Sequence, residues 1–105
     1  MNLNKRIVKI DKKNIGDHYP TYITFELGPT HQGLDSAKRL ISFASEAGAD
    51  AVKFQIFDPD RLVADKKQIF SYDVLKNRET GETETIEEPL YDILSRRCLS
   101  ENQWI

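Results

Sequence analysis

Two short segments of the chain alternate apolar and polar residues in the way that β-strands do. They cover residues 22–27 (YITFEL) and 51–56 (AVKFQI). Successive side chains of a strand point to opposite faces of its sheet, so each segment has one apolar and one polar face. Because burying an unpaired charge costs several kcal/mol, polar groups on interior faces need partners or a ligand. The pattern therefore predicts a candidate site on shared interior faces, formed by Thr24, Glu26, Lys53 and Gln55.

The residues between these segments have the period of a helix. From residue 35 to residue 47, apolar side chains recur at i, i+3, i+4 and i+7. Asp35 or Ser36 can cap the start of this helix, and Gly48 lies where a left-handed C-terminal cap belongs. The order strand, glycine-bracketed loop, helix, strand is a βαβ unit, which almost always joins parallel strands. The sequence therefore predicts an α/β protein.

The regions on either side of this unit predict further elements. Residues 6–20 fit a short hairpin, and the polar stretch 58–88 reads as a long loop that contains a hairpin from residue 71 to residue 86. Loops at the carboxyl ends of parallel strands commonly surround active sites. Residues 89–98 fit a short helix with a proline at its first position, and a Ser100–Gln103 capping box predicts that another helix begins there.

Composition and charge exclude several classes of protein. The chain has 105 residues, 15 basic and 17 acidic, which suits one ordinary domain and implies neither nucleic acid nor an anionic membrane as a partner. No apolar run approaches the ~20 residues of a transmembrane helix, and no signal peptide is recognisable, so a cytoplasmic location is expected. The single cysteine, Cys98, cannot form an internal disulfide and is expected to be an ordinary thiol.

Two strands and one completed crossover leave sheet edges unpaired and apolar faces only partly covered. We therefore expect the chain to be the first part of a larger protein. We also expect that the 105 residues alone are inactive and fold poorly.

The strings YITFELGPTHQG and SAKRLISFASEAGADAVKFQIFDPDRL resemble the N-terminal part of the N-acetylneuraminate (sialic acid) synthase family. The usual pattern of that family is A-E-I-G-x-N-H-x-G, a helix, and then G-A-D-A-V-K-F-Q. The resemblance is close over residues 22–62 and looser over residues 90–104. It implies the N-terminal portion of a (β/α)₈ TIM barrel, preceded by a β-hairpin and truncated after about two strands. The implied parts are an N-terminal hairpin (1–20), the first βαβ unit (21–57), a long active-site loop (58–88) and the start of the second helical region (89–105).

The resemblance also implies an activity for the full-length protein. That activity is the condensation of phosphoenolpyruvate with an N-acyl hexosamine, such as N-acetylmannosamine, to a nonulosonic (sialic-type) acid with release of phosphate. A divalent metal, manganese or magnesium, is implied as a cofactor, with histidine ligands beyond residue 105. Members of the family are cytoplasmic homodimers, so a homodimer is implied as well.

Site residues carry over where the motif matches. Glu26 and Lys53 are the expected catalytic residues, with Glu26 on the amino sugar and Lys53 with Gln55 on phosphoenolpyruvate. A lysine suits this ligand because phosphoenolpyruvate carries a carboxylate and a phosphate. The expected substrate-binding residues are Lys53, Gln55, Thr30, His31 and Gly28. Where the family has asparagine this chain has Thr30, preceded by Pro29, so a different N-acyl sugar, such as a diamino-trideoxy precursor of legionaminate or pseudaminate type, is an alternative substrate.

Several structural alternatives stay open for these residues. Lys53 can form a structural ion pair with Glu26, and Gln55 can be a hydrogen-bonded core residue. His31 can simply hydrogen-bond the backbone. For Asp58 and Asp60 the alternatives are turn or helix-cap residues and groups of a pocket or metal site.

Two other functions also stay open. One is a different TIM-barrel enzyme that uses phosphoenolpyruvate or a phosphate ester. The other is a non-catalytic α/β binding module.

Overall fold

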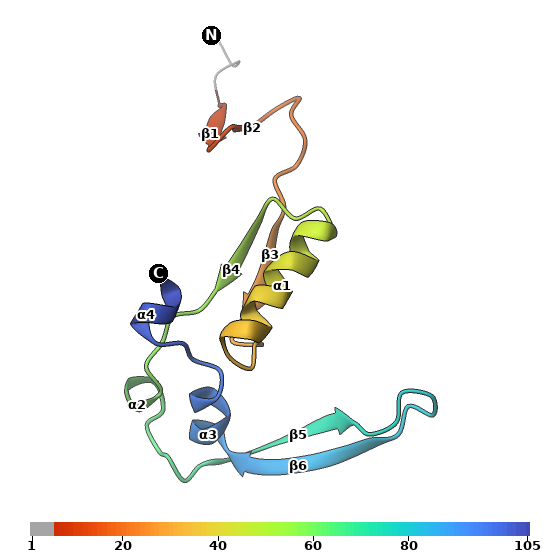
Figure 1. Ribbon diagram of the computed structural model, residues 1–105, viewed down its shortest axis with the longest axis vertical. Helices are drawn as coiled ribbons and strands as arrows, with labels where there is room; N and C mark the ends of the chain where they lie inside the picture. Colours follow the sequence, from red (N-terminus) through yellow and green to blue (C-terminus); the bar gives the residue numbers. More distant parts are fainter. Residues whose placement is uncertain (1–5) are drawn as a thin grey trace.

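The computed structural model describes residues 6–105, which form three separate two-stranded sheets and four helices (Figure 1). The molecule is elongated, with principal extents of 58 × 39 × 28 Å. In chain order the elements are β1 (Val8–Ile10), β2 (Lys13–Ile15), β3 (Thr24–Gly28), α1 (Leu34–Glu46), β4 (Ala51–Phe54), α2 (Pro59–Leu62), β5 (Ile69–Leu75), β6 (Thr83–Pro89), α3 (Leu90–Ser95) and α4 (Glu101–Trp104).

The predicted βαβ unit is confirmed. Strands β3 and β4 pair in parallel, with Glu26 opposite Lys53, and α1 lies along one face of the pair (Figure 1). Strand β3 begins at Thr24, two residues later than predicted. The backbone N–H of Ile23 donates to the Asp50 carboxylate at 2.8 Å, while its carbonyl accepts the backbone N–H groups of Asp50 and Ala51. Strand β4 ends at Phe54, two residues earlier than predicted.

Helix α1 matches its predicted period but not its predicted N-terminal cap. It begins at Leu34 with Gly33 as the N-cap, so the expectation that Asp35 or Ser36 caps it is wrong. Asp35 lies in the first turn instead, where its negative charge is favourable to the helix dipole. At the other end Gly48 has a φ of +91°, which confirms the predicted left-handed residue after the helix.

Both predicted hairpins are present. Strands β1 and β2 pair antiparallel within the expected N-terminal hairpin, of which residues 1–5 lie outside the described residues. Strands β5 and β6 pair antiparallel over seven residues each, slightly longer than predicted, and the turn contains Gly81 at a φ of +73°. This second hairpin extends away from the rest of the molecule, at the end where β3 and β4 finish (Figure 1).

The C-terminal part follows the sequence pattern closely. Pro89 is the N-cap of α3 and not its first helical residue, a shift of one position. Helix α4 begins after Ser100, and the predicted capping box with Gln103 is present, with the Ser100 N–H donating to the Gln103 side-chain oxygen at 2.9 Å. Within residues 6–105, no helix has the length and apolar character needed to cross a membrane.

Apolar side chains are only partly covered in residues 6–105. Ala37 and Ala44 of α1 are buried, and so is Ile93 of α3. Other large apolar side chains remain open, among them Phe43 at 62% and Ile56 at 76% exposed. The α/β class is therefore confirmed, and a closed barrel stays a prediction.

Candidate functional site

The predicted pair Glu26 and Lys53 lies together at the carboxyl end of the parallel strands. The two residues are direct neighbours across the β3–β4 ladder, and the Lys53 ammonium donates to Glu26 Oε2 at 2.7 Å. The other carboxylate oxygen, Oε1, accepts the backbone N–H of Gly28 at 2.9 Å. Both oxygens of the carboxylate are therefore engaged, one by a side chain and one by the backbone.

Within residues 6–105 this face of the sheet is open, and the expectation that the pair is interior to a barrel stays a prediction. The side chains of Lys53 and Glu26 are 63% and 53% exposed, because within residues 6–105 α1 lies on the other face. The hydrogen bond from Lys53, followed by the attraction of its charge, keeps the pKa of Glu26 below its usual range. The carboxylate is thus ionised at neutral pH. An ion pair this exposed adds little to the free energy of unfolding. Its two charged groups are therefore of interest as groups that can contact a ligand.

Gly28 and Gln55 complete this group. A Cβ atom on Gly28 would lie 3.6 Å from Glu26 Oε1 and 3.7 Å from Gln55 Nε2, so the glycine separates the two side chains. Its φ of +48° lies in the left-handed region that favours glycine, and the pairing of β3 with β4 shifts register between Glu26 and Gly28. This irregular end of β3 is what turns the N–H of Gly28 back toward the carboxylate. Thr24 is exposed as well.

Thr30 and His31 do not join this group. The Thr30 hydroxyl donates to the backbone carbonyl of Leu27 at 2.6 Å, within its own turn. His31 is fully buried, and its ring lies edge-on to Phe54 with the centroids 5.9 Å apart. By the alternation along β4, Phe54 points to the face opposite Lys53. The substrate-binding roles of Thr30 and His31 therefore stay predictions without support from this geometry.

The environment of His31 is apolar on one side and hydrogen-bonded on the other. The Gly33 backbone N–H donates to Nδ1 at 3.3 Å, and Nε2 is buried without a partner among the described residues. Burial lowers the pKa of His31, with a smaller effect from the charge of Arg97. The ring is therefore neutral at physiological pH, and the proton lies on Nε2 since Nδ1 accepts. This is close to the alternative in which the loop histidine bonds the backbone.

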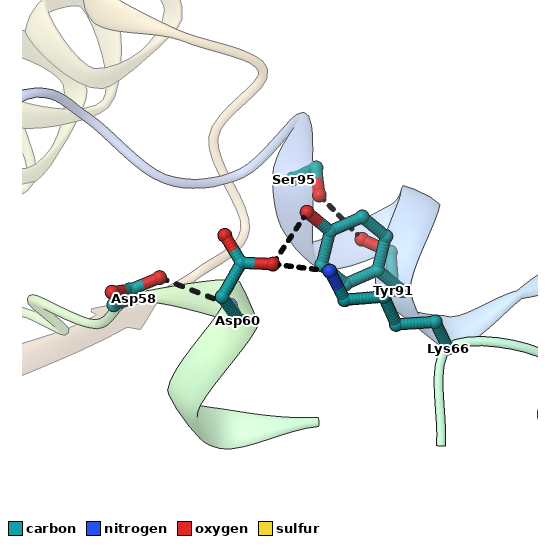
Figure 2. Close-up of polar contacts among 5 residues, drawn as sticks. All are labelled: Asp58, Asp60, Lys66, Tyr91 and Ser95. Atoms are coloured by element: carbon teal, nitrogen blue, oxygen red, sulfur yellow. Dashed lines mark hydrogen bonds and ion pairs between the residues drawn. The ribbon is translucent and has the colours of Figure 1, made fainter. Parts of the chain in front are cut away.

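A second polar cluster lies beyond the carboxyl end of β4 (Figure 2). Asp58 caps α2 by accepting the Asp60 backbone N–H at 3.0 Å, which confirms the helix-cap alternative for Asp58. The Asp60 carboxylate accepts the Tyr91 hydroxyl at 3.0 Å and pairs with Lys66, whose ammonium lies 4.6 Å from the Tyr91 ring centroid. The Lys66 and Tyr91 bonds lower the pKa of Asp60. The cluster joins α2, the segment between α2 and β5, and α3. Ser95 Oγ donates back to the Tyr91 carbonyl.

A third cluster joins the same hairpin to α3, and sequence analysis missed it. Arg96 donates to both oxygens of Glu88 at 2.8 and 2.7 Å, and the Tyr72 hydroxyl donates to the same carboxylate at 2.6 Å. The Arg96 bonds, and then the Tyr72 bond, lower the pKa of Glu88 to about 2. Tyr72 and Glu88 are on different strands and Arg96 is the C-cap residue of α3, so no local motif signals the group. The base of the hairpin is consequently held at two places.

An open cavity of about 620 Å³ lies next to the site residues without including them. Its lining runs from the residues after β4 through α2 and returns along the segment before α4 and α4 itself, and includes Ile56, Asp58, Leu62, Cys98 and Trp104. Asp58 thus both caps α2 and lines a cavity, so the pocket alternative for Asp58 stays open. None of the six predicted site residues lines it. No group of three histidine, cysteine, aspartate or glutamate side chains suited to a metal occurs within the described part of the chain.

Comparison with known proteins gives relatives that are named as a polysaccharide biosynthesis protein or as synthases of sialic-type acids. The chain is 51% identical over 55 residues to the spore coat polysaccharide biosynthesis protein SpsE of Bacillus subtilis, covering 51% of this chain and 15% of SpsE. It is 52% identical over 42 residues to the human N-acetylneuraminate-9-phosphate synthase, covering 39% of this chain and 12% of the human protein. It is 44% identical over 64 residues to the N,N'-diacetyllegionaminic acid synthase of Legionella pneumophila, covering 60% and 17%.

The matched segments are thus less than a quarter of the length of these relatives. No solved structure matches the chain significantly. The sequence profile of the NeuB family matches residues 40–104, which is more than half of the 105 residues and includes Lys53 in β4 and Gln55 just after it. The chain therefore belongs to the NeuB family.

Proposed function

We propose that the natural polypeptide containing this chain condenses phosphoenolpyruvate with an N-acyl hexosamine and releases phosphate, forming a nonulosonic acid. The observation that carries the proposal is the group Glu26, Gly28, Lys53 and Gln55 at the carboxyl end of two parallel strands. In α/β proteins the carboxyl ends of the strands are where ligands bind. Membership of the NeuB family and relatives named as legionaminic acid and N-acetylneuraminate-9-phosphate synthases support the same reaction class.

Lys53 is the proposed anion-binding group. Its ammonium is on the open face of the sheet, with a side chain that is 63% exposed and able to reach a ligand. Phosphoenolpyruvate is multiply charged, and a positive group beside the departing phosphate stabilises the charge that develops on it. Gln55, two residues further along and exposed on the same face, can donate to a carboxylate or phosphate oxygen through its amide.

Glu26 is the proposed partner of the sugar. Its low pKa keeps it ionised, so it acts as a hydrogen-bond acceptor for hydroxyl groups. In the condensation a carbon–carbon bond forms between the methylene carbon of the enol phosphate and the sugar aldehyde, water is taken up, and phosphate leaves. A fixed acceptor near the aldehyde orients the sugar for this step.

We also propose that the complete natural polypeptide is a homodimer and uses a divalent metal. The divalent cation that the resemblance implies, manganese or magnesium, has no three-residue ligand set within residues 6–105, and we propose that its ligands lie beyond residue 105. We also propose that β3 and β4 are neighbouring strands of a (β/α)₈ barrel, with the β5–β6 hairpin beside its mouth.

The test is phosphate release by the complete natural polypeptide. Phosphoenolpyruvate, manganese and a panel of N-acyl mannosamine-type and diamino-trideoxy sugars are supplied, and sugar-dependent phosphate is measured. No sugar-dependent release with any member of the panel would overturn the proposal.

Lys53→Met is expected to lower kcat/KM by about 100- to 1,000-fold, because it removes the charge that faces the anion while keeping most of the side chain. Lys38→Met on α1, where Lys38 is also exposed, is the matched control and should retain activity. Circular dichroism checks that both variants stay folded. Retained activity in Lys53→Met would show that the lysine is only half of a structural ion pair.

A further inference from the structure

We propose that, before substrate binds, the Glu26 carboxylate pairs with the Lys53 ammonium as an internal placeholder for an anion. An incoming phosphate-bearing substrate displaces Glu26 from Lys53. This displacement frees the Glu26 carboxylate for the second substrate. The inference rests on the proposed function, because it assumes that Lys53 binds an anion. It adds a coupling between the two halves of the site. Binding of the anion and release of the acceptor for the sugar become the same event.

The first support is the contact between the two groups. Lys53 Nζ lies 2.7 Å from Glu26 Oε2, which is a full charge-assisted hydrogen bond. A multiply charged anion that approaches the same ammonium meets a carboxylate already in place, and like charges at this separation repel. The anion must therefore either push Glu26 away from Lys53 or bind with a penalty.

The second support is that Glu26 has an independent anchor. Its other oxygen, Oε1, accepts the Gly28 N–H at 2.9 Å, and this bond does not involve Lys53. The left-handed conformation of Gly28, with a φ of +48°, turns that N–H toward the carboxylate. When Lys53 is taken by an anion, Glu26 thus stays at the end of β3 with Oε2 vacant. A vacant carboxylate oxygen beside Gln55 is an acceptor for a sugar hydroxyl.

The third support is exposure. Within residues 6–105 both side chains are more than half exposed, at 63% for Lys53 and 53% for Glu26. An exposed ion pair is weak, with a contribution equivalent to about a 1.4- to 5-fold change in an equilibrium constant. A pair this weak can be opened by a substrate of ordinary affinity.

The experiment measures binding of phosphoenolpyruvate alone, by titration calorimetry, to the complete natural polypeptide. Glu26→Gln keeps the shape and removes the charge. Glu26→Asp keeps the charge but shortens the side chain, so that it no longer reaches Lys53. Glu46→Gln, at the exposed end of α1, is the matched control for loss of a surface charge. Inorganic phosphate is titrated in parallel, to separate recognition of phosphate from recognition of the whole substrate.

The expected result is that Glu26→Gln and Glu26→Asp each bind phosphoenolpyruvate about two- to fivefold more tightly than the wild type, while Glu46→Gln is unchanged. Turnover with the sugar should nevertheless fall in Glu26→Gln, since the charged acceptor is replaced by a neutral amide that offers only one acceptor oxygen. Unchanged or weaker binding in Glu26→Gln overturns the placeholder. Tighter binding in Glu26→Gln with wild-type binding in Glu26→Asp also overturns it, because charge alone would then explain the effect.

The outcomes also separate this inference from the proposed function. Sugar-dependent phosphate release by the wild type, without tighter binding in the Glu26 variants, overturns the placeholder and leaves the proposed reaction standing. Tighter binding in both variants without release from any sugar supports the placeholder and overturns the reaction. Absence of phosphoenolpyruvate binding in the wild type overturns both.

Discussion

Replacement of Gly28 by alanine tests the irregular end of β3 on which the site depends. Gly28 has a φ of +48°, and an alanine in the left-handed region costs about 1–2 kcal/mol. The added Cβ would meet Glu26 Oε1 at 3.6 Å and Gln55 Nε2 at 3.7 Å, which are ordinary contacts and not clashes. Strain and not crowding therefore sets the magnitude, and we expect the free energy of unfolding to fall by about 1–2 kcal/mol.

Relaxation of this backbone strain at position 28 would break a specific hydrogen bond. If the new alanine relaxes toward a negative φ, its N–H turns away from Glu26 Oε1 and the 2.9 Å bond is lost. Glu26 then loses its anchor at the end of β3, and kcat/KM for the sugar should fall about tenfold, equivalent to ~1.4 kcal/mol of transition-state stabilisation.

Gly81 provides the matched control. It has a φ of +73° in the turn of the β5–β6 hairpin, and a Cβ there would meet nothing within 4 Å. Gly81→Ala should thus cost the same strain without touching the site. Denaturant unfolding and phosphate release are measured for both variants of the complete polypeptide. A Gly28→Ala variant as stable as the wild type, or a Gly81→Ala variant that loses as much activity as Gly28→Ala, would refute this role of Gly28.

Two further predictions concern the helix and the hairpin. Ala44 is 4% exposed on α1, so Ala44→Leu should overpack its site and lower the free energy of unfolding by about 1–3 kcal/mol. Ser45→Leu, on the exposed side of the helix, should not lower it. Equal losses of stability for the two variants in urea unfolding would contradict this. For Glu88, whose pKa is lowered from 4.5 to about 2, the folded state favours the ionised form, so its contribution is present above about pH 4.5 and is lost as the pH falls toward 2. The difference in Tm between wild type and Glu88→Gln should shrink over that range, and a difference independent of pH would rule out the Arg96 pairing as its cause.

Local signals in the chain were sufficient for most of the elements. The βαβ unit, both hairpins and the Ser100–Gln103 capping box depend on residues close together in sequence, and all are confirmed. The N-terminal cap of α1 was misplaced by two or three residues, because Gly33, Asp35 and Ser36 are all acceptable caps and their competition depends on the loop geometry. The parallel pairing of Glu26 with Lys53 was predictable because alternation and chain order together restrict the register.

Burial and long-range contacts were not predictable in this way. Alternation shows which side chains share a face but not what covers that face, and within residues 6–105 the face with Glu26 and Lys53 is open. The position of His31 against Phe54 depends on the path of a loop, which has no period from which to infer it. Asp60 and Tyr91 are 31 positions apart in the sequence, on either side of the β5–β6 hairpin, and no local motif links them to each other or to Lys66.

By itself, the sequence determined the class of the fold, the parallel neighbours β3 and β4, and the four side chains that share their polar face, because these follow from the period of side-chain directions along a strand or helix. The tertiary structure alone decided that the Glu26 carboxylate is shared between Lys53 and the Gly28 N–H, that His31 turns to the other face, and that the hairpin is anchored by Asp60 and Glu88. Those features depend on where the backbone of one segment places its donors relative to the acceptors of another segment. A local sequence pattern does not determine such distances.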